Sequence, residues 1–336
     1  MGKIYILYYE FKSTAGNHAG MAYLARYLAK NNSQVYLIRH IPQEYKGGKY
    51  IGYMYSLLLA LYLLLRVRKN DKIFFMEYIS GHFAYQENIA KWFKFFNKKN
   101  QLLGLVHLSG IHLKEYYKNE EAILSRLLHL DKVVVFGSSL KSFIMQLGFP
   151  REIICTFHYV DTMYYKPAAI LPVQGELQVV FVGNLKRNFK QLEEIIKGSD
   201  GSIRFHICMG KFAQALTLES YSNVSLYGFL EEDDLLKLLQ SCHVNLSVLQ
   251  DTVGSNAITC SLAAGLVQVG SDVGSIRDYC DGQDSFLCKN TSEFIKALET
   301  LQKDSMQVVQ MRNNAVKKAA NFSKENFLNE FEKFWR

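Results

Sequence analysis

Proline is scarce in this sequence, at 4 of 336 residues, and charged residues make up only 21% against 49% hydrophobic ones. Such a composition excludes a disordered or fibrous chain and is typical of an ordered globular protein. The six cysteines have neither CxxC spacing nor a histidine-rich companion, so we expect reduced thiols and neither a zinc site nor a disulfide framework. The first residues lack a basic stretch followed by a cleavable apolar segment, which predicts a cytoplasmic protein without a signal peptide.

A long apolar run is also missing. The longest uncharged one, residues 51–65, is shorter than the roughly 20 residues that span a bilayer. It predicts a helix that is either buried or lies at a membrane interface, and we favour burial because apolar helices are commoner in cores. Arg66, Arg68, Lys69 and Lys72 follow this run, a pattern that would suit a peripheral position on the anionic inner face of the cell membrane.

The net charge of +8 is unevenly distributed along the chain. Up to Pro167 there are 22 basic and 11 acidic residues, a net +11, whereas the remainder has 17 basic and 20 acidic residues, a net −3. Clustered Lys and Arg favour nucleic acid, an anionic membrane or an acidic substrate. No nucleic-acid-binding motif accompanies the basic residues, so we expect no nucleic acid partner.

Short runs rich in Val, Ile and aromatic residues alternate with helical patterns, which predicts parallel sheets built from βαβ units. The chain exceeds the usual size of one core, so two doubly wound domains are expected, with residues 167–175 as the linker. The predicted strands are 4–9, 35–39, 73–76, 102–106, 133–136 and 153–157 in the first half, and 179–182, 204–208, 224–226, 244–248 and 267–270 in the second. Among the predicted helices are 231–240, 256–264, 292–302, 305–320 and 324–334.

Ligands of such sheets bind beyond the carboxyl ends of the strands, so the loops there are the candidate sites. After the first strand, residues 13–20 include Gly16 and Gly20 and precede a helical run. Small residues at a helix N-terminus let backbone amides approach an anion. The loop does not match GxGxxG, and an ordinary βα turn remains an alternative.

Two loops of the second half have features of a diphosphate site. Gly183 ends a predicted strand and is followed by Lys186 and Arg187, whose cations suit phosphate oxygens, although a solvated loop would look similar. The second loop is the stronger signal, because it leads into a short, nearly uncharged helix that Gly265 ends. The free amides and the helix dipole favour an anion there. The residues at this helix start are Gly254, Ser255, Asn256 and Ala257.

His107 stands at the end of the predicted strand 102–106. A histidine at such a position can hydrogen-bond a substrate or act as a general base. A structural role is the simpler interpretation for one histidine without a carboxylate partner.

The sequence resembles the family 4 glycosyltransferases of the GT-B fold, which are retaining enzymes that use nucleotide-sugar donors. Residues 154–167, with Val160-Asp161 and Lys166-Pro167, resemble the hinge of that family. Residues 180–183, 226–229, 244–248 and 255–265 with 271–276 resemble its donor domain, and residues 322–327 resemble the start of its C-terminal helix. The resemblance implies an α/β fold of two Rossmann-like, doubly wound domains that face each other across a cleft. The implied domains are an acceptor-binding one (1–167), a donor-binding one (168–321) and a returning helix (322–336).

The sequence departs from this family at the donor site. Two glutamates separated by seven residues usually contact the transferred sugar and the ribose, and the matching positions here are Thr252 and Cys260. Asn184 replaces the usual arginine, while Arg187 occupies the usual lysine position. Asp251 lies beside the first missing carboxylate and is a candidate substitute. His107, Arg187 and Asp251 are therefore the candidate catalytic residues.

The resemblance implies a glycosyltransferase that moves a sugar from a nucleotide-sugar donor to a glycan or lipid-linked acceptor, with retention, in bacterial surface polysaccharide synthesis. Neither a metal nor another cofactor is expected. The absence of both glutamates keeps open a non-catalytic GT-B protein that binds nucleotide sugars or a partner subunit. A nucleotide-sugar epimerase of the same fold is a third alternative.

Overall fold

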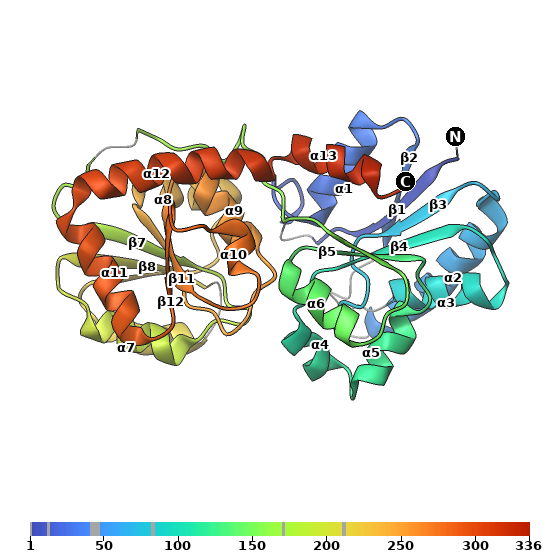
Figure 1. Ribbon diagram of the computed structural model, residues 1–336, viewed down its shortest axis with the longest axis horizontal. Coiled ribbons are helices and arrows are strands. Elements are labelled where there is room, and N and C mark those ends of the chain that lie inside the picture. The colour runs from blue at the N-terminus through green and yellow to red at the C-terminus, as the bar shows by residue number, and fades with distance from the viewer. Residues whose placement is uncertain (1, 12–13, 41–47, 82–84, 170–171, 210–212) are drawn as a thin grey trace. The chain divides into compact units, whose positions relative to one another are not determined.

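The chain divides into two compact units (Figure 1). Unit 1 comprises Met1–Phe157 together with Leu328–Arg336, and unit 2 comprises His158–Phe327. This computed structural model describes residues 2–11, 14–40, 48–81, 85–169, 172–209 and 213–336. Each unit has its own sheet and its own helices, and each is described separately below.

Unit 1 contains a six-stranded sheet in the order β2-β1-β3-β4-β5-β6, in which all neighbouring strands are parallel. The strands form because their runs are rich in Val, Ile, Leu and aromatic residues, which are buried on both faces in the central strands and partly exposed in the edge strands β2 and β6. The strands are β1 (Ile4–Tyr9), β2 (Val35–His40), β3 (Lys72–Phe75), β4 (Gln101–Val106), β5 (Lys132–Val135) and β6 (Glu152–Cys155).

Helices connect these parallel strands, as parallel pairing requires. A capped example is α5, where the Asn119 side chain accepts a hydrogen bond from the amide of Ala122 at 2.8 Å and two glutamates complement the dipole of the first turn. The helices of this part of unit 1 are α1 (Met21–Asn31), α2 (Gly48–Arg66), α3 (Gln86–Phe95), α4 (Gly110–Tyr116), α5 (Glu120–Leu127) and α6 (Ser138–Gln146). In the described part of the chain, none of the helices combines the length and the apolar character needed to cross a membrane.

Unit 2 repeats the architecture with a six-stranded parallel sheet in the order β12-β11-β10-β7-β8-β9. Its strands are β7 (Leu177–Val182), β8 (Ile203–Cys208), β9 (Val224–Tyr227), β10 (Val244–Ser247), β11 (Val267–Ser271) and β12 (Ser285–Cys288). Its helices are α7 (Phe189–Gly198), α8 (Glu232–Ser241), α9 (Asn256–Ala263), α10 (Ile276–Tyr279), α11 (Thr291–Lys303) and α12 (Ser305–Ala319), with the short 3-10 helices η3 (Ala213–Ser220) and η4 (Ala320–Phe322).

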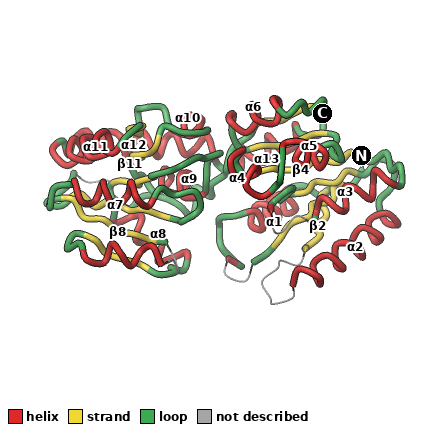
Figure 2. The backbone as a smooth tube through the Cα atoms, turned by 90° about the horizontal axis from the view of Figure 1, so that it is seen from below, coloured by secondary structure: helices red, strands yellow, loops and turns green. Residues whose placement is uncertain are grey.

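One face of this second sheet packs on α7 and α11 through a continuous apolar core. Alternate strand residues, such as Val179 and Phe181 of β7, contribute to that core. Figure 1 shows α8 and α9 on the other side of the strands, and Figure 2 shows strands flanked by helices in each unit. The sheet is therefore doubly wound, as predicted, and both units have the expected Rossmann-like architecture.

The last helix, α13 (Lys324–Lys333), begins in unit 2 and ends in unit 1. Lys324 forms an ion pair with buried Asp161 at 2.5 Å, and its amide donates to the carbonyl of Val160 at 3.0 Å. At its other end Phe331 is buried against Phe74 of β3, with ring centroids 5.7 Å apart. The chain therefore passes from unit 2 back into unit 1 within α13, which is a second crossing besides the one at residue 157.

Two sequence predictions need correction. The boundary expected at Pro167 lies inside unit 2, because His158 donates its amide to the hydroxyl of Tyr279 and Val160 pairs with Ser323. Of the predicted linker 167–175, residues 170–171 lie outside the described part of the chain.

The favoured burial of residues 51–65 is also wrong, because α2 exposes large apolar side chains along much of its length. The strand β12 was not predicted.

Candidate functional site

Two predicted loops of unit 2 lie side by side at the carboxyl ends of β7 and β10. These strands are neighbours in the sheet, so the loops that follow them leave the same edge. The amide of Gln250 donates to the carbonyl of Lys186 at 2.9 Å, and the amide of Asn188 donates to the carbonyl of Val248 at the same distance. The structure thus brings the loop with Gly183, Lys186 and Arg187 to the loop that leads into α9.

Arg187 is half-buried at this edge and has no carboxylate partner among the described residues. Its guanidinium donates to the carbonyl of Val182 at 2.9 and 3.3 Å and to that of Leu185 at 3.2 Å. Burial lowers the pKa of Arg187 to about 10, so the group remains cationic at neutral pH. A largely desolvated cation without a counter-charge is costly, and an anionic ligand would relieve that cost.

The start of α9 provides backbone donors at the same edge. The Ser255 hydroxyl accepts from the amide of Ile258 at 3.4 Å and caps the helix. The amides of Ser255, Asn256 and Ala257 donate to no acceptor within the described residues. The Asn256 side-chain oxygen is buried and, in the same part of the chain, also lacks a hydrogen-bond partner. The unsatisfied amide donors at the positive end of the helix dipole form a site suited to an anion, whereas the Asn256 oxygen can only accept a hydrogen bond, for example from a hydroxyl.

Close packing holds the α9 loop in place. Gly254 has a φ of +89°, and a Cβ there would lie 2.2 Å from the ring of Tyr279. The Tyr279 hydroxyl in turn donates to the carbonyl of Val253 at 3.3 Å. The glycine is therefore required both by its backbone conformation and by its neighbour.

The two positions at which the resembled family usually has glutamate carry no carboxylate here. Thr252 is buried, and its hydroxyl accepts from the amide of Gly254 at 3.0 Å. Cys260 is buried in α9, and burial raises the pKa of its thiol well above its usual range. Asp251, the candidate substitute, is half-buried and uses one carboxylate oxygen to accept from the amide of Thr252 at 2.8 Å. Its second oxygen is the one left for a ligand.

The remaining predicted residues belong to unit 1. Gly16 and Gly20 lie between β1 and α1, both with positive φ, and apart from their own chain neighbours no atom of the described residues lies within 4 Å of the Cβ position of either. Ser13, the first residue of the predicted loop, lies outside the described residues. Gly16 and Gly20 therefore have open space around them where a ligand could approach the backbone.

His107 follows β4, as predicted. Burial, with a smaller contribution from His112, lowers the pKa of His107 to about 4, so its ring is neutral at pH 7. Its Nδ1 atom is buried and has no hydrogen-bond partner among the described residues. A neutral ring with an unsatisfied nitrogen can accept or donate a single hydrogen bond to a substrate.

The sequence analysis missed Glu77, which lies just beyond the end of β3, between the ends of β1 and β4 in the sheet order. Its side chain is 9% exposed, and the described residues offer its carboxylate neither a hydrogen bond nor an ion pair. Burial raises the pKa of Glu77 to about 8. Nothing in the local sequence distinguishes Glu77, because its burial depends on how other segments pack around it. Its backbone amide donates to the side-chain oxygen of Gln86 at 3.1 Å.

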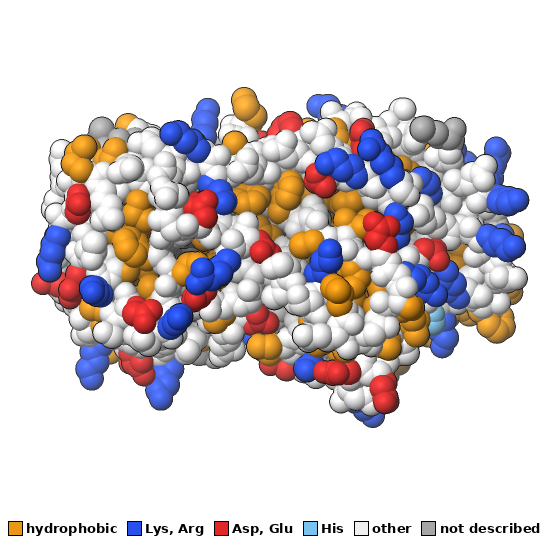
Figure 3. Space-filling view, viewed as in Figure 1, with side chains coloured by type: hydrophobic (Ala, Val, Ile, Leu, Met, Phe, Trp, Pro, Cys, Tyr) orange, Lys and Arg blue, Asp and Glu red, His pale blue; other side chains and the backbone are white. Residues whose placement is uncertain are grey.

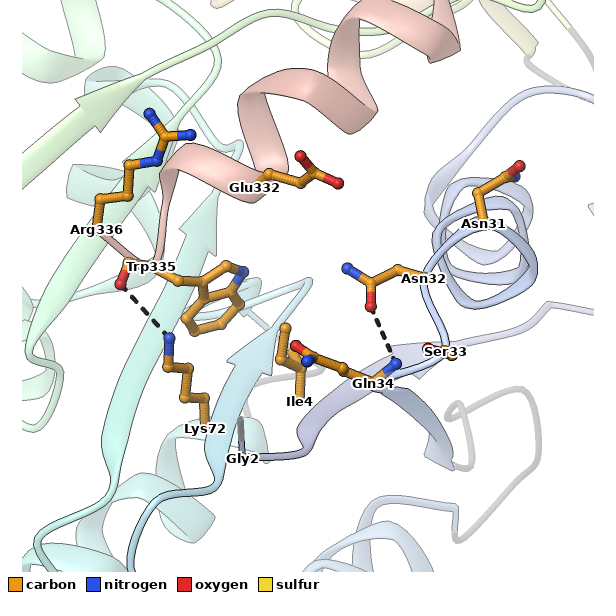
Figure 4. A pocket seen from close by; sticks show the side chains of 10 residues that line it. All are labelled: Gly2, Ile4, Asn31, Asn32, Ser33, Gln34, Lys72, Glu332, Trp335 and Arg336. Atoms are coloured by element: carbon orange, nitrogen blue, oxygen red, sulfur yellow. Dashed lines mark hydrogen bonds between the residues drawn. The ribbon is translucent and has the colours of Figure 1, made fainter.

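A pocket of about 560 Å³ also opens in unit 1, at the opposite end of the sheet (Figure 4). Its lining includes Gly2, Gln34 and Lys72, which precede or begin β1, β2 and β3, and Trp335 near the end of the chain. Lys72 donates to the carbonyl of Trp335 at 3.4 Å. None of the predicted site residues lines this pocket, so it is separate from the candidate site.

Metal ligands are not gathered at either edge. Within the described ranges, no group of three or more His, Cys, Asp or Glu side chains is placed to hold a metal ion.

Residues 176–304 match the family model described as Glycosyl transferases group 1. The match lies within unit 2 and covers both loops at the ends of β7 and β10. This segment is a glycosyltransferase domain. No curated protein matches the sequence significantly.

Solved structures share the fold over the whole chain. Sucrose-phosphate synthase from Thermosynechococcus elongatus is 11% identical and covers 100% of this chain and 98% of its own, with a TM-score of 0.79. A UDP-forming α,α-trehalose-phosphate synthase from Burkholderia xenovorans, in complex with glucose-6-phosphate, is 11% identical and covers 100% of both chains, with a TM-score of 0.73. HepE from Anabaena, in complex with UDP and glucose, is 13% identical and covers 99% of both chains, with a TM-score of 0.72.

At such identities these structures show the fold alone, and that fold is GT-B. The predicted fold class is confirmed, and the predicted glycosyltransferase is confirmed at the level of its family model and fold. Membership of family 4 in particular, and the role of each site residue, stay predictions.

Glu77 makes a testable contribution to the pH dependence of stability. The unfolded chain loses this proton near the ordinary pKa of 4.5, whereas the folded chain keeps it up to about 8. The free energy of unfolding should therefore fall as pH rises between these values, by at most about 1.4 kcal/mol per pH unit from this group. In Glu77→Gln that loss should be absent, so urea unfolding from pH 5 to 8 should show the variant gaining on the wild type.

Glu121→Gln, at an exposed position of α5, is the matched control and should keep a constant difference from the wild type. Parallel stability curves for wild type and Glu77→Gln would show that Glu77 ionises normally.

Proposed function

We propose that this chain transfers a sugar from a nucleotide-sugar donor to a glycan or lipid-linked acceptor, and that the donor diphosphate binds in unit 2 between Arg187 and the start of α9. The observation that carries the proposal is the cationic, half-buried Arg187 beside unsatisfied helix amides at one sheet edge. The family match of residues 176–304 covers that edge and supports the assignment.

A diphosphate fits the chemistry of this edge. Arg187 can bind two phosphate oxygens through its planar guanidinium, and the amides of Asn256 and Ala257 can donate to others. Lys186, Gly183, Gly254 and Ser255 shape the same loops. HepE, which shares the fold, was solved with UDP, and this supports a nucleoside diphosphate as the ligand class.

Stabilising the departing diphosphate is the main catalytic contribution we assign to unit 2. Negative charge develops on the leaving phosphate as the sugar bond breaks, and cations and amides already fixed in place stabilise it without reorganisation. This chemistry requires neither a covalent intermediate nor a metal ion, and we propose that the transfer proceeds without either and with retention of configuration. Asp251 is the residue we assign to the sugar, through its second carboxylate oxygen.

Unit 1 is the proposed acceptor domain. The neutral ring of His107 can accept a hydrogen bond from an acceptor hydroxyl, and the space beside Gly16 and Gly20 lets the sugar or its phosphate approach this loop. We propose that the acceptor is part of a bacterial surface polysaccharide and that the protein works at the cytoplasmic face of the membrane.

A non-catalytic donor-binding protein is the second candidate. The buried Thr252 and Cys260, at positions where related enzymes carry carboxylates, favour it. Such a protein would bind nucleotide sugars through the same edge without turning them over. Binding and turnover therefore have to be measured separately.

Arg187→Ala should weaken the binding of a nucleoside diphosphate by roughly 1.5–3 kcal/mol, because a charge-assisted hydrogen bond is lost. Titration calorimetry with UDP, GDP and ADP would identify the preferred nucleotide and then measure the loss. Arg187→Lys should recover only part of the affinity, because a single ammonium lacks the planar guanidinium fork.

Arg204→Ala is the matched control, because this arginine lies in the same sheet near the start of β8 and pairs with Glu176. It should bind nucleotide as the wild type does. Unchanged affinity in Arg187→Ala would remove Arg187 from the site.

Turnover separates the two candidate functions. When UDP-, GDP-, ADP- and CMP-sugars are added one at a time, the sugar nucleotide that the protein binds should raise its melting temperature. A transferase should then release the nucleoside diphosphate or monophosphate of that donor when an acceptor glycan or lipid extract is supplied. Asp251→Asn should reduce release while leaving the shift in melting temperature. A shift in melting temperature without nucleotide release under any acceptor condition would identify the binding protein instead, and conversion of the donor sugar without acceptor would identify an epimerase.

A further inference from the structure

Helix α2 has its small side chains inward and its large apolar side chains outward. Gly48, Gly52, Ser56 and Ala60, four residues apart, are buried. A Cβ on Gly52 would lie 2.8 Å from the ring of Tyr85, so the helix packs closely on unit 1 through these small residues. Apart from Arg66, the exposed residues described in this helix are all apolar or aromatic and are 46–82% exposed: Tyr50, Ile51, Tyr53, Met54, Leu58, Leu61, Tyr62 and Leu65.

Helix α3 packs against α2 and extends this apolar surface with three aromatic rings. Trp92, Phe95 and Phe96 are 39%, 79% and 50% exposed. Their rings contact one another, with centroids 5.1 Å apart for the two phenylalanines and 5.6 Å apart for Trp92 and Phe96. An exposed apolar area of this kind marks an interaction surface. Figure 2 shows α2 along the outer margin of unit 1.

Exposed cations border this surface. Arg66 ends α2, Arg68 and Lys69 follow it, and Lys99 follows α3. Asn100 links the two segments, because its side-chain amide donates to the carbonyl of Arg68 at 2.6 Å. Lys91 on α3 is a further exposed cation. Blue and orange side chains both reach the surface at the edge where Figure 1 places α2 and α3 (Figure 3).

Carboxylates near these cations point into the protein and do not neutralise the surface. No acidic residue occurs in α2. Asp71 is buried and accepts from the amides of Lys3 at 2.7 Å and Arg68 at 2.9 Å. Glu87 of α3 is paired with Arg126 at 3.2 Å. In the described part of the chain, this surface therefore combines apolar side chains with positive charge alone.

Lys72, which the sequence analysis grouped with these cations, does not belong to the surface. It lies in β3, half-buried, and its amine is directed to the carbonyl and ring of Trp335. The three cations at the end of α2 are thus Arg66, Arg68 and Lys69.

We propose that the α2–α3 surface inserts into the interface of an anionic lipid bilayer, with the apolar residues of both helices at the level of the acyl boundary and the cations at the headgroups. Aromatic and aliphatic side chains beside Lys and Arg are the pattern of helices that lie in a membrane interface. In a symmetric self-interface, the described residues of a second copy would present the same cations and no carboxylate to pair with them, which opposes a self-interface.

The test is co-sedimentation with vesicles of neutral phosphatidylcholine and of phosphatidylcholine mixed with phosphatidylglycerol. The wild type should bind the anionic vesicles, and binding should weaken as salt is added. Replacing Arg66, Arg68 and Lys69 together with Gln should lower the partition coefficient about 100-fold at low salt. The triple change Leu58→Gln, Leu61→Gln and Leu65→Gln should lower it by at least about 100-fold at any salt concentration.

Matched controls come from elsewhere on the protein. Ile111→Gln with Met145→Gln removes two exposed apolar side chains from α4 and α6, and Lys197→Gln with Lys303→Gln removes two exposed cations of unit 2. Both double variants should bind vesicles as the wild type does. Retained nucleotide binding and melting temperature show that each variant is folded.

Fluorescence provides a second measurement, because the chain has only two tryptophans. Emission should shift to shorter wavelength on anionic vesicles and be quenched by spin-labelled lipid. Trp92→Phe should abolish the shift while leaving most of the vesicle binding, since the other tryptophan, Trp335, lies away from this surface in the pocket at the amino ends of the strands.

Equal binding to neutral and anionic vesicles, or no vesicle binding, would overturn the proposal. So would a dimer in sedimentation velocity that the Leu→Gln variant converts to a monomer, which would assign the surface to a second copy. The proposal does not rest on the donor chemistry, because vesicle binding and nucleotide binding are measured independently and either can fail alone.

Discussion

The parallel pairing of β7 with β10 determines where the chemistry of unit 2 can occur. Neighbouring parallel strands end at the same edge, so the cationic loop after β7 and the loop leading into α9 are brought together. The central strands are buried, and the polar side chains within them, such as Asn245 and Gln268, pair with each other, so free polar groups can face a ligand only where the strands stop. Arg187 and the amides before Ile258 are the result: a positive charge and unsatisfied donors held on a rigid sheet.

The same packing limits what this edge can do. Thr252 and Cys260 are buried at the positions where related enzymes carry carboxylates, and neither can be replaced by a charged group without cost in that environment. In the proposed donor site, the anion-binding groups are therefore present, and Asp251 is the one carboxylate we assign to it. Transfer by this chain would depend on stabilising the leaving diphosphate more than on contacts to the sugar.

Most of the fold could be predicted from the sequence, because buried parallel strands are apolar runs that helices separate. The strand β12 was missed because its four residues, Ser285–Cys288, lack such a run. The two loops of unit 2 were found because glycines, cations and a helix start are local features. The exposure of α2 and the burial of Glu77 depend instead on which residues other elements cover, and no local pattern records that.

The central claim, that a nucleoside diphosphate binds where β7 and β10 end, is tested most directly by amide hydrogen exchange with and without the preferred nucleoside diphosphate. We expect slower exchange in residues 183–188 and 254–259, because the ligand would accept hydrogen bonds from these amides and shield their loops. The pocket residues around Gln34 should exchange at the same rate in both samples. Protection confined to that pocket, or none in either loop despite saturating nucleotide, would contradict the claim.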